Sequence, residues 1–111
     1  MSYTVKKNTL LLPSGKEVEF EYPILQATDL GGVIVICLAV PQNRKLNENV
    51  YAVDHEGTLL WQVKPVKHVY DKSSYVGVTN TGKLVRLFNW DGMVYDVDPK
   101  TGVVANSYWG K

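Results

Sequence analysis

The chain has 111 residues, the length of one ordinary domain, and its 45% hydrophobic and 21% charged composition is typical of a soluble globular protein. Twelve basic and eleven acidic side chains give a net charge of +1. A balance so even favours neither nucleic acid nor an anionic membrane as partner, because both attract a concentrated positive charge. We therefore expect a single domain over residues 1–111 that forms its core without metal or disulfide.

Turn signals recur along the whole chain and separate runs rich in Val, Ile, Leu, Tyr and Phe. Glycine allows the positive φ of tight hairpins, and Asn or Asp before it tolerates the same region. No window shows helical spacing with a cap and a stop. We predict an all-β domain of about ten short strands in successive antiparallel hairpins, arranged as two sheets or as a half-propeller-like meander. The predicted turns are Pro13-Ser14-Gly15, Gly31-Gly32, His55-Glu56-Gly57, Asn80-Thr81-Gly82, Asp91-Gly92 and Pro99-Lys100-Thr101-Gly102.

The first hairpin contains the alternating stretch "EVEFEY", residues 17–22. On a strand, Glu17, Glu19 and Glu21 share one face, with carboxylates about 7 Å apart. Such a row is common as a charged sheet edge that discourages aggregation. Alternatively, it is a stripe that docks a basic partner and raises the association rate.

The apolar run "VIVICLAV" contains Cys37, the only cysteine of the sequence. A thiol in such a strand behaves as a small buried hydrophobe, because a reactive thiolate needs an accessible, electropositive setting. No intramolecular disulfide is possible, the amino terminus does not read as a signal peptide, and no run reaches the ~18 apolar residues of a membrane span. These features predict a cytoplasmic protein without a membrane partner.

Two longer polar connections interrupt the hairpins, at residues 41–49 and 65–74. Long connections in a compact β domain often carry function, so Arg44, His68 and Tyr70 are candidates for a binding edge. His68 is also conceivable as a general base, with Ser73 or Ser74 nearby in the sequence. No nucleophile-elbow motif accompanies it, and we expect no catalysis.

The segment "NWDGMVYDVDPKTGVVANSYW", residues 89–109, brings three aspartates close together in the sequence. Asp96 and Asp98 echo the start of a calcium loop, but Lys100 occupies a ligand position and no glutamate completes the pattern. Turn chemistry explains Asp91 and Asp98 better, so we expect neither a metal nor a cofactor. Trp90, beside the Asp91-Gly92 turn, is instead a candidate contact residue.

Three segments share one pattern of an aromatic β run, a turn with glycine and a second β run. "VYAVDHEGTLLWQV" and "VYDVDPKTG" resemble strand pairs in β-propeller repeats of the pyrroloquinoline-quinone type. The resemblance covers about a third of the chain and implies propeller-like hairpins, not a quinone cofactor. The matching positions are Tyr51, Asp54, Gly57, Leu60 and Trp61, and then Tyr95, Asp98, Thr101 and Gly102.

In size, hairpin architecture and cysteine content the chain also resembles stand-alone immunity proteins of bacterial toxin systems, including contact-dependent growth inhibition. The resemblance implies a non-enzymatic protein-binding module that covers a basic, nuclease-like toxin domain. The alternative is a small-molecule or glycan-binding β module with a shallow pocket near Trp90. The predicted partner-binding residues are Glu17, Glu19, Glu21, Arg44, His68, Tyr70, Trp90 and Asp91.

Overall fold

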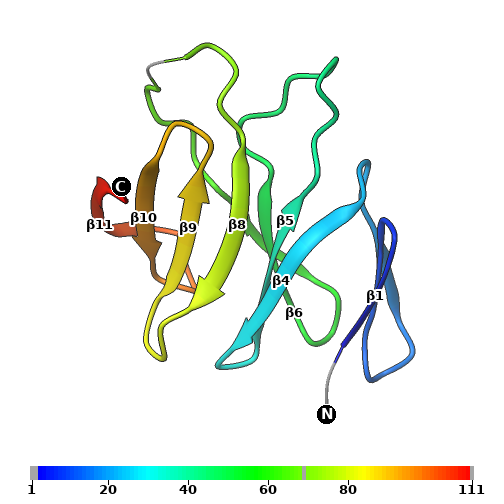
Figure 1. Cartoon of the computed structure of the whole chain (residues 1–111). Helices are drawn as coiled ribbons and strands as arrows, with labels where there is room; N and C mark the ends of the chain where they lie inside the picture. Colours follow the sequence, from blue (N-terminus) through cyan, green and yellow to red (C-terminus); the bar gives the residue numbers. More distant parts are fainter. Residues whose placement is uncertain (1–2, 69, 111) are drawn as a thin grey trace.

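The computed structural model describes residues 3–68 and 70–110, which form eleven strands and no helix (Figure 1). Strands that are neighbours in a sheet are also neighbours in the sequence, so the chain is a meander of antiparallel hairpins. The predicted all-β class and successive hairpins are confirmed, and the hairpins form three sheets.

The first sheet contains β1 (Thr4–Lys6), β2 (Thr9–Leu11) and β3 (Glu17–Glu19). The second contains β4 (Ile24–Leu30), β5 (Val33–Leu38), β6 (Val50–Asp54) and β7 (Leu59–Gln62). The third contains β8 (Tyr75–Asn80), β9 (Val85–Asn89), β10 (Met93–Val97) and β11 (Val104–Trp109).

The glycine turns lie where the sequence predicts them. Gly31 and Gly32 join β4 to β5 with φ angles of 62° and 85°. Two consecutive positive φ angles suit a two-residue hairpin, because such a turn matches the twist of the strands it joins. The connection between β9 and β10 is one residue longer than the predicted Asp91-Gly92 pair, since Trp90 also lies outside the strands.

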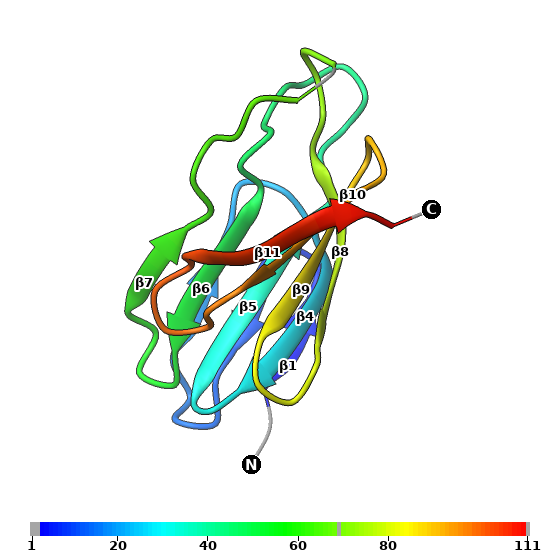
Figure 2. The same cartoon turned by 90° about the vertical axis from the view of Figure 1, so that its left-hand side faces the viewer.

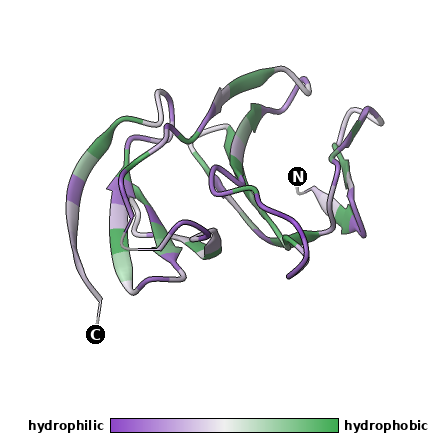
Figure 3. Ribbon diagram, turned by 90° about the horizontal axis from the view of Figure 1, so that it is seen from above, coloured by the Kyte–Doolittle hydropathy of each residue, from purple (hydrophilic) through white to green (hydrophobic). Residues whose placement is uncertain are grey.

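The second sheet lies between the other two, and Figure 3 shows the three sheets side by side. Its strand β5 is buried along its whole length. Alternate residues of a strand point to opposite faces. Val33, Val35 and Cys37 therefore join the core shared with the third sheet, while Ile34, Ile36 and Leu38 join the core shared with the first. Burial on both faces explains why this run is continuously apolar.

Side-chain amides connect β4 of the second sheet to β8 of the third. Gln26 Oε1 accepts a hydrogen bond of 2.9 Å from Val78 N, and Asn80 Nδ2 donates to Thr28 Oγ1 and Asp29 O at 3.3 Å. These bonds join neighbouring strands where no backbone ladder exists between the two sheets. They hold the second half of β8 against β4.

The aspartates of residues 91–98 are dispersed by the fold. Asp96 is buried on β10, where its carboxylate accepts two hydrogen bonds from Arg86, at 2.9 and 3.2 Å. Asp98 lies in the β10–β11 turn and accepts a 2.8 Å bond from Lys100 N. Within residues 3–68 and 70–110, no three His, Cys, Asp or Glu side chains are grouped as metal ligands would be. The same residues include no helix that could cross a membrane.

Candidate binding site

Three connections gather at one end of the sheets, which we call the loop end. They are residues 39–49 between β5 and β6, 63–74 between β7 and β8, and 90–92 between β9 and β10. Because alternate turns of a meander lie at the same end of its strands, these connections are brought together although they are distant in sequence. Figures 1 and 2 show the two longer connections reaching beyond the strands on this side.

Asn49, directly before β6, holds the base of the loop end together. Its side chain is fully buried. The amide Nδ2 donates to Leu38 O at 2.7 Å and to Tyr75 O at 2.8 Å, and Oδ1 accepts from Tyr75 N at 2.7 Å. One side chain thus replaces backbone pairing between the ends of β5 and β8, which lie in different sheets. The sequence places Asn49 in a polar connection and gives no signal for this role.

A second set of polar contacts ties the connections to one another. Asn89 Nδ2 donates to Ser73 O at 3.1 Å, and the Ser73 hydroxyl donates to Asn89 Oδ1. Ser73 N donates to Asn47 Oδ1 at 2.9 Å, and Asn47 Nδ2 donates to Asp71 O at 2.8 Å. Every buried side-chain nitrogen or oxygen among the described residues has a partner. The loop end is therefore held in one arrangement by its own hydrogen bonds.

His68 and Asp91 form a buried pair beneath this surface. His68 Nδ1 lies 3.0 Å from Asp91 Oδ2, and the two side chains are only 3% and 2% exposed. The imidazole meets the rings of Tyr75 and Tyr95 edge-on, with centroids 6.4 and 6.5 Å away. Burial is the main cause that raises the pKa of both tyrosines. The partner-binding role of His68 and Asp91 stays a prediction; their side chains are buried and contact each other.

Tyr70 and Trp90 form the exposed part of the site. Their side chains come from different connections, are 52% and 58% exposed, and meet edge-to-face with centroids 5.2 Å apart. They border a hollow of about 560 Å³. The residues that line the hollow are Val40, Gln42, Tyr70, Lys72, Ser74, Val76 and Trp90.

Lys72 fixes one side of this hollow. Its ammonium group donates to the carbonyls of Pro41 and Gln42, which joins the 63–74 connection to the 39–49 connection. Trp90 N donates to Ser74 O at 2.9 Å, which fixes the indole-bearing backbone to the start of β8. The sequence identified the two connections and Trp90 but gave no signal for Val40 and Val76, because only the fold brings β8, which carries Val76, beside the connection that carries Val40.

The fold separates the remaining predicted residues into two groups. Arg44 is exposed on the 39–49 connection and belongs to the loop end. The three glutamates are exposed as predicted, with Glu17 and Glu19 on β3, at the edge of the first sheet, and Glu21 just beyond it. None of the three lines the hollow.

Comparison with known proteins assigns the chain to a family. The family whose model matches is described as Domain of unknown function (DUF7957), and the match covers residues 1–109. The chain belongs to the DUF7957 family. No curated protein matches this DUF7957 domain. Among solved structures, the crystal structure of the computationally designed Ika8 protein is similar over 98% of the chain, with 12% identity and a TM-score of 0.36. The DUF7957 chain spans 48% of that protein's length.

Proposed function

We propose that this DUF7957 domain is a non-enzymatic binding module that covers a protein partner through its loop end. The observation that carries the proposal is the exposed Tyr70–Trp90 pair beside an open hollow. Trp and Tyr are enriched among the residues that dominate binding energy in protein interfaces. A tryptophan exposed to this extent beside a second aromatic ring is a suitable anchor for a partner surface.

The polar contacts below the pair favour binding for a second reason. Asn49, Ser73 and Asn89 hold the three connections in place before any partner arrives. A surface ordered in advance loses less conformational entropy on association. The contacts also argue against catalysis by His68 with Ser73, because the Ser73 hydroxyl donates to Asn89 and the His68 side chain is buried against Asp91.

The finer form of the proposal is a cytoplasmic immunity protein that covers a basic, nuclease-like toxin domain. Exposed Glu17, Glu19 and Glu21 support it, because carboxylates in a row attract a basic surface. Since these glutamates do not line the hollow, they would contact a different part of the toxin. A toxin encoded beside this protein should be inhibited by wild type and much less by the triple Glu→Gln variant.

The general proposal is tested with Trp90→Ala and the matched control Trp109→Ala. Both indoles are 58% exposed, but Trp109 lies on β11, outside the hollow. A protein that co-purifies stoichiometrically from the native cell should bind Trp90→Ala at least about 30-fold more weakly, the effect of a dominant interface residue. Calorimetry should give the wild-type affinity for Trp109→Ala. Equal affinities of the two variants would show that the loop end is not the contact surface.

A glycan or other small molecule is the second candidate ligand. The hollow of about 560 Å³ lies within the range of small-molecule sites, and Gln42 and Ser74 offer hydrogen-bonding groups beside the rings. A glycan array probed with wild type and Trp90→Ala separates this function from protein binding. Specific signals that vanish in the variant would support the glycan site, and a blank array would exclude the glycans tested.

A further inference from the structure

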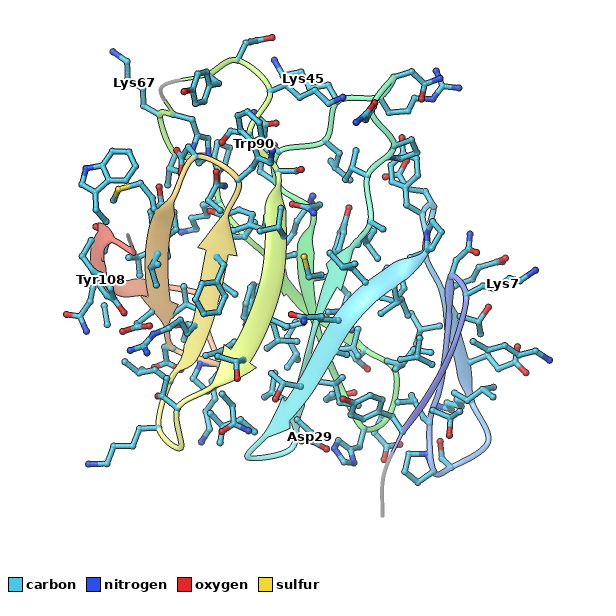
Figure 4. The ribbon with its side chains drawn as sticks, viewed as in Figure 1. Lys7, Asp29, Lys45, Lys67, Trp90 and Tyr108 are labelled. Carbon is cyan, nitrogen blue, oxygen red and sulfur yellow. The ribbon has the colours of Figure 1, made fainter. Side chains whose placement is uncertain are left out.

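The even net charge of the chain conceals an uneven distribution. The 39–49 and 63–74 connections carry five cationic side chains, Arg44, Lys45, Lys64, Lys67 and Lys72, against two exposed or half-exposed carboxylates, Glu48 and Asp71. Over the whole chain the numbers are twelve and eleven, so the remaining residues are acidic on balance. Figure 4 shows Lys45, Lys67 and Trp90 at the same end of the molecule.

The cations at the loop end differ in what they contact. Lys45 forms an ion pair with Asp71 at 2.7 Å, and the Lys72 ammonium donates to the carbonyls of Pro41 and Gln42 in the neighbouring connection. Arg44, Lys64 and Lys67 are exposed, and none forms an ion pair with any carboxylate of the described residues. Three cations thus remain available to a partner. The hollow between the connections is bordered by two aromatic rings and the aliphatic side chains of Val40 and Val76.

We propose that the loop end binds an acidic segment of another protein, which inserts one large apolar side chain into the hollow and places carboxylates against Arg44, Lys64 and Lys67. The inference rests on the proposed protein-binding function and adds the chemistry of the partner. Most residues that line the partly apolar hollow, and the three exposed cations, belong to the same two long connections. This combination favours an acidic segment with an apolar side chain, because complementary charges guide association while the buried apolar contact provides affinity. A toxin that pairs its basic surface with Glu17, Glu19 and Glu21 would therefore have to present an acidic segment to the loop end.

Single-stranded nucleic acid also combines negative charge with stacking groups, but the geometry favours a peptide. Tyr70 and Trp90 meet edge-to-face at an interplanar angle of 74°, rather than forming parallel platforms for successive bases. Val40 and Val76 supply aliphatic walls that suit a side chain. Asp71 and Glu48 interrupt the positive charge, whereas a nucleic-acid site maintains it along the phosphate backbone.

Selection from a phage-displayed library of random peptides tests the partner chemistry without knowing the partner. Immobilised wild-type protein is the bait, and immobilised Trp90→Ala removes peptides that bind elsewhere. The expected products carry Asp or Glu on both sides of a Trp, Phe or Leu. Enriched peptides that depend on Trp90 but lack acidic residues would overturn this inference and leave the proposed function standing. If no enriched peptide depends on Trp90, the hollow is not a peptide-binding site, and the inference is overturned.

The strongest selected peptide, synthesised with fluorescein, then serves as the probe in fluorescence anisotropy. The variant Lys64→Glu/Lys67→Glu should bind it about tenfold or more weakly at low salt, and the difference should shrink as salt screens the charges. Lys83→Glu is the control for one charge reversal, because Lys83 is exposed in the β8–β9 turn at the opposite end of β8. Equal affinities of wild type and the double variant would overturn the charge assignment.

A fluorescein-labelled oligodeoxythymidine is the probe for nucleic acid. We expect the oligonucleotide to bind more weakly than the peptide and to dissociate as salt is added. Its affinity should be the same for wild type and Trp90→Ala. Tighter binding of the oligonucleotide, lost in both Trp90→Ala and Lys64→Glu/Lys67→Glu, would overturn the peptide assignment in favour of single-stranded nucleic acid.

Discussion

His68 and Asp91, which are 23 residues apart in sequence, lie with Nδ1 and Oδ2 3.0 Å apart and with both side chains almost completely buried. Asp91 Oδ1 also accepts a 2.8 Å hydrogen bond from Met93 N. The pair therefore connects the long 63–74 connection to the turn that carries Trp90. It adds a buried contact to the Tyr70–Trp90 ring contact and the Trp90 N–Ser74 O hydrogen bond, which join the same two connections.

We expect this pair to couple the stability of the two connections. His68→Ala and Asp91→Ala should each lower the free energy of unfolding by about 2–3 kcal/mol, because each leaves the other side chain buried without its hydrogen-bond partner. The double variant should lose less than the sum, with a coupling of about 1 kcal/mol or more. Urea denaturation of the four proteins measures this cycle. Strict additivity would mean that the two side chains stabilise the fold independently.

Gly102 should be intolerant of any side chain. Its φ is 75°, and an added Cβ would lie 2.6 Å from the ring of Trp61, whose Nε1 donates to Pro99 O. Gly82→Ala is the matched control, since Gly82 also has a positive φ of 99° but open space around it. We expect Gly102→Ala to cost at least about 2 kcal/mol more than the control in urea denaturation. Equal costs would show that backbone strain alone limits both positions.

Asp96 should make stability depend on pH. The hydrogen bond from Arg86 is the main cause that holds the pKa of Asp96 below its usual value of 3.8. The folded state therefore binds the proton less readily than the unfolded state, so this contribution is fully present above the usual pKa. It is lost as pH falls through the lowered one. Denaturation at a series of acid pH values should show this loss in wild type, and Asp96→Asn and Arg86→Gln should lack it. A slope unchanged in both variants would assign the acid sensitivity to other carboxyl groups.

Cys37 should be unreactive until the protein unfolds. Its side chain is fully buried, and burial raises the pKa of the thiol to about 12. Few molecules then carry the reactive thiolate at neutral pH. Ellman's reagent should react with the native protein only as fast as it opens, and rapidly once urea unfolds it. Rapid labelling under native conditions would mean that β5 opens far more easily than a core strand should.

Several features of the fold could be predicted from the sequence because they depend on local chemistry. The Gly31-Gly32 pair predicts a turn. Alternating polar and apolar residues, or a continuous apolar run, predict the strands that flank such turns. The two polar connections are visible as interruptions of this rhythm, and the exposure of Glu17 and Glu19 follows from simple alternation. Trp61 lies on β7, the strand after the Gly57 turn, and is buried in the core, with 9% of its surface exposed.

The sequence by itself determined the all-β class, the hairpins, the buried Cys37 strand and the regions that contain the candidate site. Only the tertiary structure decided which faces meet, because packing depends on residues distant in the chain. It placed the second sheet between the other two, buried His68 with Asp91, and brought Tyr70 to Trp90. It also separated the cations of the loop end from the glutamates of β3, a distribution that a net charge of +1 cannot reveal.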